Sequence, residues 1–300
     1  SAASDVYKRQ DNGVVEEGVS QTGQEVTAAV VSNMTRGRSC SCLMAEKAET
    51  EVFPIDMGIA CEVEHRGELH PLTERKIRRG TSNFTKAAAM TRQEVLTAIL
   101  TGIDAVRVLK EQGYRLSAVG EMGIGNTTTS SAVASVLLQK DPELVTGAGA
   151  GLDSAGLKRK TEAIRRGIGL HHPDPMDGME VLQKVGGFDL AAMAGAFLGG
   201  AIYHVPVVID GVIAAAAAAA AGRIAPAATD YMLAAHVSAE PASIWLLDLI
   251  GVTPAIQAGL RLGEGTGALA LFPLLDMALS IYRDMDTFAE MEIEEYKPLV

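Results

Sequence analysis

The chain has 300 residues, of which 48% are hydrophobic and 21% charged, and its formal net charge is −11. This length and composition predict a globular protein with a sizeable buried core and exclude a disordered chain. The acidic balance argues against nucleic-acid binding, because the phosphates of DNA and RNA would be repelled. A small phosphorylated ligand stays compatible with it, since such a ligand needs only a local group of backbone N–H donors.

Cysteine usage and apolar runs limit the class of protein further. The three cysteines, Cys40, Cys42 and Cys61, lack the spacing of a zinc or redox motif, so we expect packed thiols in a cytoplasmic protein without a metal site. The longest apolar run, near residues 205–221, includes an aspartate and a glycine. It is interpreted as a buried strand, a loop and a helix, so we expect no membrane partner.

Short apolar strands alternate with helices along the chain. Residues 1–10 have no clear pattern and are interpreted as a disordered or foreign leader. Strands are predicted at residues 51–57, 116–119 and 205–209. Helices are predicted at residues 24–36, 91–112, 131–138, 157–168, 191–202, 214–221, 241–250, 254–260 and 266–282, the second of them beginning with a capping box. The alternation indicates an α/β fold with a mostly parallel sheet, whose ligands bind where strands end, after residues 119 and 209 and around residue 263.

The segment GEMGIGNTTT at residues 120–129 joins a predicted strand to a predicted helix. Its glycines allow a sharp turn, and Asn126 and Thr127 would lie at a helix N-terminus, where N–H groups and hydroxyls can hold a phosphate. The segment is neither a Walker loop nor a dinucleotide fingerprint, because the required lysine and the last glycine are absent. From these residues alone, a phosphate site and an ordinary capped turn are both open.

A carboxylate stands between two glycines in the segment RLGEGTG at residues 261–267. Glu264 can act there as a general base, and Glu121 is a second acid in a glycine-rich loop. A carboxylate that merely favours the helix dipole is the alternative for Glu264. A lysine of the basic segment at residues 158–160, which follows the glycine-rich loop at residues 147–153, can bind phosphate, and so can Ser238. Their alternatives are a solvated basic helix face and a capping serine.

Taken together, these segments resemble the nicotinate-nucleotide–dimethylbenzimidazole phosphoribosyltransferases of cobalamin lower-ligand assembly. The similarity extends from about residue 11 to residue 288. It is carried by DNGV at 11–14, GVS at 18–20, EVT at 25–27, GEMGIGNTTT at 120–129, GAGLD at 149–153, Lys160, KVGGFD at 184–189, DG at 210–211, HVSAE at 236–240 and RLGEGTG at 261–267. Several such strings in this order are far more specific than any one of them.

The resemblance implies an architecture. It predicts a doubly wound, mostly parallel sheet flanked by helices over residues 11–280, and a small helical subdomain to which residues 281–300 contribute. It also predicts a homodimer. The family normally has some tens of residues before the DNGV-like motif, so we expect a chain that is short at the N-terminus, with an incomplete small subdomain and impaired activity.

The resemblance also implies a reaction that needs no cofactor. A base, 5,6-dimethylbenzimidazole, attacks nicotinate mononucleotide, which gives α-ribazole 5′-phosphate and nicotinate. Glu264 would take the azole proton, and Glu121 would face the substrates. The phosphate and ribose would lie against Gly123, Asn126, Thr127, Gly149, Gly151, Lys160 and Ser238, and the aromatic base would lie near Thr22, Val30, Ile124 and Leu262. Some relatives have His in place of Asn12 and Gln near Val30, so the identity of the base stays open among benzimidazoles, purines and phenols.

Two other functions remain as alternatives at this stage. A nucleotide-binding dehydrogenase would need a G-x-G-x-x-G motif after its first strand, and that motif is absent. A non-catalytic module could hold a nucleotide or a benzimidazole without joining them. An assay for α-ribazole phosphate distinguishes the enzyme from such a module.

Overall fold

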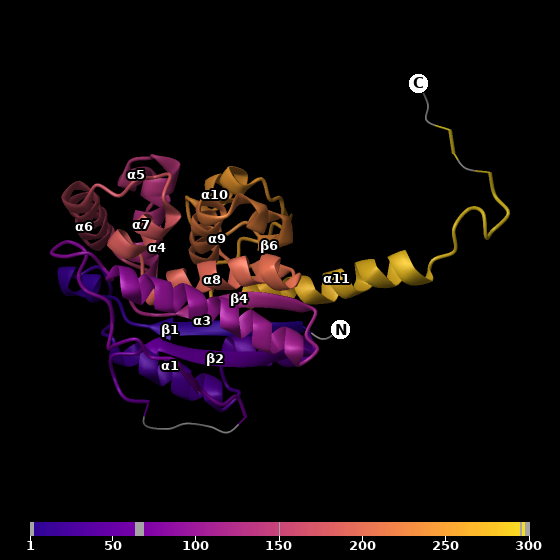
Figure 1. The fold of residues 1–300 in the computed structure, drawn as a ribbon, viewed down its shortest axis with the longest axis horizontal. Helices are drawn as coiled ribbons and strands as arrows, with labels where there is room; N and C mark the ends of the chain where they lie inside the picture. The colour runs from indigo at the N-terminus through magenta and orange to yellow at the C-terminus, as the bar shows by residue number, and fades with distance from the viewer. Residues whose placement is uncertain (1–2, 64–68, 150, 295, 298–300) are drawn as a thin grey trace.

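The computed structural model describes residues 3–63, 69–149, 151–294 and 296–297. Within these ranges, seven strands form one sheet in the order β3-β2-β1-β4-β5-β6-β7, and neighbouring strands are parallel (Figure 1). The strands are β1 (Ala3–Gln10), β2 (Thr50–Gly58), β3 (Thr73–Glu74), β4 (Leu116–Met122), β5 (Val207–Ile209), β6 (Met232–His236) and β7 (Pro254–Ile256). The predicted fold class, α/β with a doubly wound parallel sheet, is confirmed.

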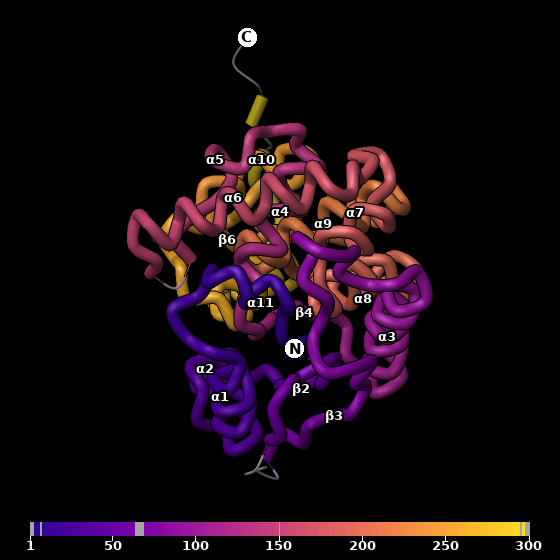
Figure 2. Tube along the Cα trace, turned by 90° about the vertical axis from the view of Figure 1, so that its left-hand side faces the viewer, coloured from indigo at the N-terminus to yellow at the C-terminus, as the bar shows by residue number. Residues whose placement is uncertain are grey.

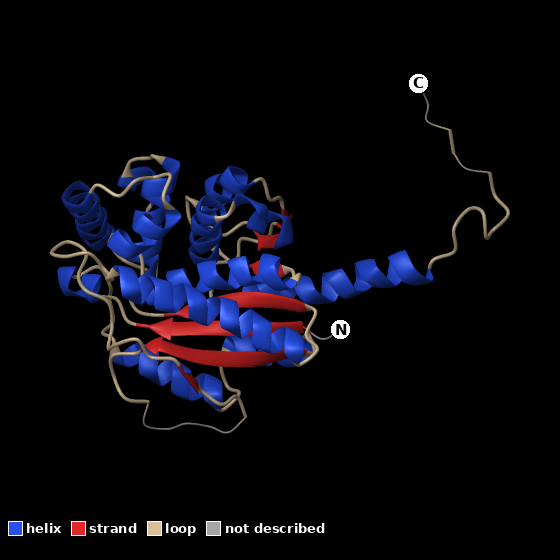
Figure 3. Cartoon of the chain, in the orientation of Figure 1, coloured by secondary structure: helices blue, strands red, loops and turns tan. Residues whose placement is uncertain are grey.

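Helices connect these strands and cover both faces of the sheet (Figure 3). The α-helices are α1 (Glu25–Thr35), α2 (Cys40–Lys47), α3 (Arg92–Glu111), α4 (Asn126–Leu138), α5 (Pro142–Val145), α6 (Ser154–His171), α7 (Gly178–Val185), α8 (Phe188–Tyr203), α9 (Val212–Ile224), α10 (Ser243–Ile250) and α11 (Thr266–Asp284). Two 3-10 helices, η1 (Gly13–Glu17) and η2 (Pro226–Tyr231), complete the set. Of the α-helices, α2, α5 and α7 were not predicted from the sequence.

Buried side chains alternate between the two faces of the sheet, as expected for strands that are covered on both sides. On one face, Val119 and Ile209 pack in the main core with residues of α3, α8 and α9. On the other face, Ala118 and Val208 pack with residues of α2 and α11. Figure 2 shows α3 and α8 on one side of the strands and α1 and α2 on the other. Burying one such valine or isoleucine contributes roughly 1.5–3 kcal/mol, so this alternation fixes which way each strand faces.

Small residues let the helices of the main core approach closely. Gly102 of α3 lies against the backbone of Ala192, and Gly195 of α8 lies against the backbone of Ile99. A Cβ at either glycine would overlap those backbone atoms, so the spacing of α3 and α8 depends on both. The run of eight alanines in α9 is fully buried, which confirms the prediction of a packed helix.

Residues 1–10 were interpreted as a disordered or foreign leader, and disorder is wrong for residues 3–10. They form β1, which lies between β2 and β4 and pairs with both. Asp5, Lys8 and Arg9 are buried on this strand, where a central parallel strand is normally apolar. These charged residues break the apolar pattern by which a strand is predicted, although their backbone groups can still pair with neighbouring strands. Burial lowers the pKa of Lys8 to about 7, partly opposed by Asp5.

Two further predictions at the edges of elements are corrected. Residues 254–260, predicted as a helix, begin instead with β7, which pairs with β6 at the edge of the sheet. Proline is tolerated at the first residue of such an edge strand. Helix α4 begins at Asn126, which confirms the placement of Asn126 and Thr127 at a helix N-terminus, whereas the hydrophobic pattern alone put the start of the helix near residue 131. Its polar first turn carries no hydrophobic periodicity, so the pattern missed it.

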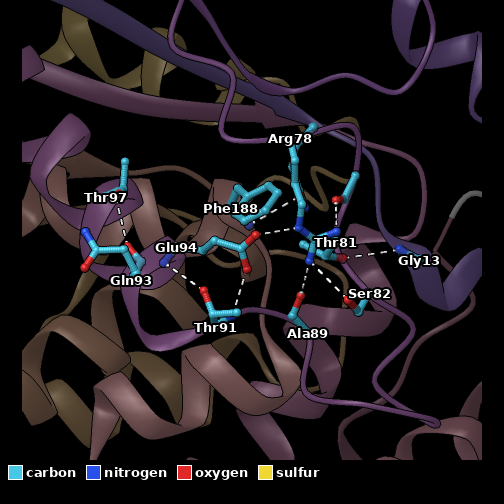
Figure 4. A network of polar contacts seen from close by, with 12 residues as sticks. Gly13, Arg78, Thr81, Ser82, Ala89, Thr91, Gln93, Glu94, Thr97 and Phe188 are labelled. Atoms are coloured by element: carbon cyan, nitrogen blue, oxygen red, sulfur yellow. Dashed lines mark hydrogen bonds and ion pairs between the residues drawn. The ribbon is translucent and has the colours of Figure 1, made fainter.

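The predicted capping box at the start of α3 is present and is joined to a wider polar network (Figure 4). The Thr91 N–H donates to Glu94 Oε2 at 2.7 Å, and the Glu94 N–H donates to Thr91 Oγ1 at 3.2 Å. Arg78 Nε donates to Glu94 Oε1 at 2.6 Å. The Arg78 guanidinium also lies over the Phe188 ring, 5.4 Å from its centroid. These contacts fix the loop between β3 and α3 to the starts of α3 and α8.

Helix α11 starts against the sheet and extends away from the rest of the molecule (Figure 1). Leu274, Met277 and Ile281 are exposed along it. The described part of residues 281–300 ends α11 and continues as turns, so a contribution to a small helical subdomain stays a prediction. Among the described residues, no helix combines the length and apolar character needed to cross a membrane.

Candidate active site

A cavity of about 220 Å³ opens where β4, β5 and β6 end. Three loops that the sequence marked as ligand-binding regions meet there, at the position where doubly wound sheets bind ligands. Its lining includes Val19, Ser20, Gln21, Glu121, Gly123, Ile124, Gly125, Asn126, Thr127, Gly149, Leu152, Asp210, Gly211, His236, Ser238, Glu240, Arg261, Leu262, Gly263 and Glu264.

The first wall is the glycine-rich turn at residues 123–127, called here the cradle. Gly125 is the N-cap of α4, has a φ of +91° and supplies no side-chain cap. A Cβ at Gly123 would overlap the backbone of Gln10, so only glycine lets the turn approach β1 so closely. The N–H groups at a helix N-terminus attract anions. The cradle therefore has the chemistry to hold a phosphate.

A buried lysine stands directly behind the cradle. Lys160 comes from α6 and is 0% exposed. Its Nζ donates to Thr127 Oγ1 at 3.0 Å and to the Gly147 carbonyl at 3.0 Å. Burial lowers the pKa of Lys160 to about 8, partly opposed by the Glu240 carboxylate. The side chain is thus a cation near neutral pH, one residue removed from the cavity and in contact with its wall.

The loop at residues 147–153 is tied to the end of β6. The Gly149 N–H donates to Glu240 Oε1 at 3.3 Å, and the Glu240 N–H donates to Ser238 Oγ at 3.4 Å. The Gln21 amide donates to the Gly151 carbonyl from the opposite side. Gly149 and Gly151 have φ values of +55° and +87°, a conformation that glycine adopts at little cost. This loop therefore closes the cavity beside the cradle.

The second wall is a turn in which three consecutive residues are left-handed, called here the left-handed turn. Gly263, Glu264 and Gly265 have φ values of +76°, +55° and +68°. The turn leads directly into α11. Glu264 is half-buried and lines the cavity, and Ser41 Oγ donates to Glu264 Oε2 at 3.5 Å. A carboxylate is thereby presented to the ligand space from a fixed piece of backbone.

Glu121 lies at the end of β4, between the two walls. It is 7% exposed, and the Asn126 amide donates to its Oε2. Burial raises the pKa of Glu121 well above its usual range, and the nearby carboxylates of Asp189, Asp210 and Glu264 add to the effect. The raised pKa favours the protonated form of Glu121, and a protonated carboxyl can donate a hydrogen bond, which an ionised one cannot do.

Asp210, at the end of β5, carries another buried carboxylate. Burial raises its pKa, and the His236 ring and the N–H groups of Gly265, Gly267 and Ala268 oppose the rise. His236 Nε2 lies 3.8 Å from Asp210 Oδ1. Both side chains are buried and line the cavity at the ends of adjacent strands.

The structure brings together most of the residues predicted for the site. Gly123, Ile124, Asn126, Thr127, Gly149, Ser238, Leu262, Glu121 and Glu264 all line the cavity. Thr22, Val30, Gly151 and Lys160 are not among the described lining residues, and binding roles for them stay predictions. Asp210, His236 and Glu240 were not predicted as site residues. Asp210 had a signal, because it follows the apolar strand predicted at residues 205–209, whereas β6, which ends at His236, was not predicted.

Comparisons with known proteins agree with this geometry. A family model described as a phosphoribosyltransferase matches residues 8–293. The chain is 45% identical over 289 residues to the nicotinate-nucleotide–dimethylbenzimidazole phosphoribosyltransferase of Ruminiclostridium cellulolyticum, covering 96% of this chain and 81% of the relative. The protein of the same name from Clostridium acetobutylicum is also 45% identical over 289 residues, with the same coverage of the two chains.

A solved structure gives the same result for the fold. CobT from Thermus thermophilus is 38% identical and superposes with a TM-score of 0.93. The superposition covers 99% of this chain and 87% of that one. The chain therefore belongs to the nicotinate-nucleotide–dimethylbenzimidazole phosphoribosyltransferase family.

Proposed function

We propose that the protein transfers the 5-phosphoribosyl group of nicotinate mononucleotide to 5,6-dimethylbenzimidazole or a related base, in the nucleotide-loop branch of cobalamin biosynthesis. The products are α-ribazole 5′-phosphate and nicotinate. The observation that carries the proposal is one cavity in which an anion cradle and a glycine-flanked glutamate meet, with a buried lysine in contact with the cradle through Thr127. The family relationship supplies the identity of the substrates.

The nucleotide is proposed to bind with its phosphate at the cradle. The N-terminus of α4 offers N–H donors, and Thr127 and Ser238 offer hydroxyls. Lys160 adds a positive charge from behind Thr127. Charge-assisted bonds of this kind contribute about 1.5–3 kcal/mol each. They would fix the ribose so that its anomeric carbon faces the left-handed turn.

The chemistry is proposed to start at Glu264. Its carboxylate takes the N–H proton of the azole, and the other ring nitrogen attacks the anomeric carbon. A new C–N bond forms while the bond to the nicotinate nitrogen breaks, and that electron pair leaves with nicotinate as a neutral pyridine nitrogen. In its protonated form, the buried Glu121 carboxyl would donate a hydrogen bond to a bound substrate.

A product assay tests the function directly. The purified chain would be mixed with nicotinate mononucleotide and 5,6-dimethylbenzimidazole, and α-ribazole phosphate would be followed by liquid chromatography. We expect stoichiometric nicotinate and α-ribazole phosphate. Nucleotide binding without product would contradict the proposal and favour a non-catalytic module. Adenine and p-cresol as alternative acceptors would identify the preferred class of base.

A homodimer in the cytoplasm is proposed as the working state. Exposed apolar side chains on α11, including Leu274, Met277 and Ile281, support association with a second copy. The free thiols of Cys40, Cys42 and Cys61 fit a reducing compartment. Sedimentation at several concentrations would measure the oligomeric state, and a monomer at all of them would contradict the dimer.

A further inference from the structure

We infer that Asp210 is a positioning residue for the transfer reaction, because its carboxylate holds the left-handed turn that presents Glu264. The inference deepens the proposed function and rests on it to the extent that Glu264 is the base. Asp210 is buried at the end of β5, whereas Glu264 precedes α11 and comes far later in the chain. The contact between Asp210 and the start of α11 therefore joins β5 to a helix that is far from it in the sequence.

The left-handed turn needs an external restraint. Left-handed conformations occur routinely as single residues and are unfavourable in sequence for residues with a Cβ. Here three residues in succession are left-handed, and the middle one is a glutamate. Strained backbone of this kind persists only where its surroundings over-determine it, and it gathers at functional sites. The surroundings must therefore hold Glu264.

Asp210 provides that restraint through both carboxylate oxygens. Oδ2 accepts from the Gly265 N–H at 3.2 Å, and Oδ1 accepts from the Gly267 and Ala268 N–H groups at 2.7 and 3.1 Å. These are N–H groups of the turn and of the first turn of α11, which lack partners within their own helix. One side chain thus satisfies three donors and attaches the turn to β5.

The residues around this contact leave it little room to shift. A Cβ at Gly267 would overlap the His236 ring and approach Asp210 Oδ1, so the third glycine of the segment is needed for the carboxylate to reach the helix. Thr266 Oγ1 donates to the Gly263 carbonyl at 2.7 Å and closes the turn from inside. The turn is therefore held at both ends, and Glu264 lies between the two attachments.

Hydrogen–deuterium exchange on the unmodified chain is the first test, because it needs neither activity nor a variant. Amides in the first turn of a helix normally exchange fast. We expect those of Gly265, Gly267 and Ala268 to be protected at least tenfold relative to unstructured amides. Unprotected amides at all three positions would overturn the inference, whatever the outcome of the product assay.

Asp210→Asn is the second test. It replaces one carboxylate oxygen, which accepts hydrogen bonds, with an NH2 group that would face the backbone N–H donors of the turn and of α11. We expect kcat to fall about 100-fold, the cost of a misplaced catalytic group, while KM for nicotinate mononucleotide changes less than threefold. The matched control is Asp177→Asn, which alters an aspartate that caps α7 through Glu180, away from the cavity. A retained kcat, or an equal loss in the control, would overturn the positioning role.

A double-mutant comparison separates positioning from simple fold stability. Glu264→Gly removes the need to hold a side-chain-bearing residue in a left-handed conformation. If Asp210 restrains that strain, Asp210→Asn should lower the unfolding midpoint less in the Glu264→Gly background than in the unmodified chain. Equal losses in the two backgrounds would contradict the inference. Should the unmodified chain form no product while these stability and exchange results hold, the proposed function fails and the restraint of the turn stands.

Discussion

The cradle at residues 123–127 and the left-handed turn at residues 263–265 are two glycine-rich turns that each begin a helix on one side of the same cavity. Both turns are rich in glycine, but they differ in how the N–H groups of the helix that follows are bound. The N-terminus of α4 has no side-chain cap at its N-cap residue, Gly125. The N-terminus of α11 receives the Asp210 carboxylate on three of its N–H groups.

This difference separates binding from chemistry. A helix N-terminus that keeps its N–H groups attracts an anion, whereas one that already holds a carboxylate would repel a phosphate. The cradle can therefore take the nucleotide's phosphate, and the left-handed turn cannot. The second turn instead uses its glycines to direct a single acidic side chain, Glu264, into the cavity.

Glu264→Gln should give the largest effect. Loss of a general base lowers turnover by about 10²- to 10⁴-fold, and we expect kcat to fall in that range. The dissociation constant of nicotinate mononucleotide, measured by calorimetry, should change little, because the cradle is intact. Glu264→Asp keeps the acid one methylene further back and should lose less. Full turnover in the glutamine variant would show that the left-handed turn has no catalytic role.

Lys160→Met should have the opposite signature. It removes the charge behind Thr127 while keeping the length of an apolar side chain, so the loss falls on nucleotide binding. We expect KM for nicotinate mononucleotide to rise about 10- to 100-fold, from the worth of one charge-assisted bond. The kcat at saturation should stay within a few-fold of the unmodified chain. A large loss of kcat with an unchanged KM would mean that the cradle takes part in chemistry.

The pH dependence of binding should follow the same lysine. Burial places the pKa of Lys160 at about 8, so the ammonium is present below that pH and is lost as the pH rises through it. Nucleotide affinity should therefore fall roughly tenfold between pH 7 and pH 9, as expected for one titrating group. The Lys160→Met variant carries no charge at this position at any pH. Its affinity should be flat over that range, and a slope equal to that of the unmodified chain would reject the assignment.

The sequence predicted the sheet class and the cradle well, because both depend on local patterns. Apolar strands at residues 116–119 and 205–209 and the glycine-rich segment after the first of them were sufficient to locate one wall of the cavity. Strand β1 was missed because Asp5, Lys8 and Arg9 break the apolar pattern that a central strand normally shows. Its pairing with two neighbours is a tertiary property that no local window contains.

The role of Glu264 as a base could be chosen over a helix-dipole contact only with the resemblance, and nothing in the sequence predicted that Asp210 restrains its turn. Spacing alone gave a carboxylate between glycines, compatible with a simple helix-dipole contact. Asp210 and Glu264 are distant in sequence and meet because β5 ends beside the start of α11. The left-handed φ of Glu264 is likewise a consequence of that packing, because glutamate has no intrinsic preference for it.

The smallest effect expected is a gain in stability at the left-handed turn. A residue with a Cβ costs about 1 kcal/mol or more in the left-handed region, and glycine avoids that cost. Glu264→Gly should therefore raise the free energy of unfolding by about 1 kcal/mol, measured with urea, while turnover is lost.

Glu49 offers the matched control for that gain. Its φ is +50° and it is exposed between α2 and β2, away from the cavity. If Glu49→Gly stabilises the chain and Glu264→Gly does not, contacts of the Glu264 side chain must compensate its strain, and the turn would be structural. Both substitutions could instead stabilise the chain while only Glu264→Gly abolishes turnover. In that case the unfavourable conformation of Glu264 is retained because its carboxylate is needed for the reaction. No substitution to glycine can give a similar gain in stability at the N-cap of the cradle, because this left-handed residue, Gly125, is already a glycine.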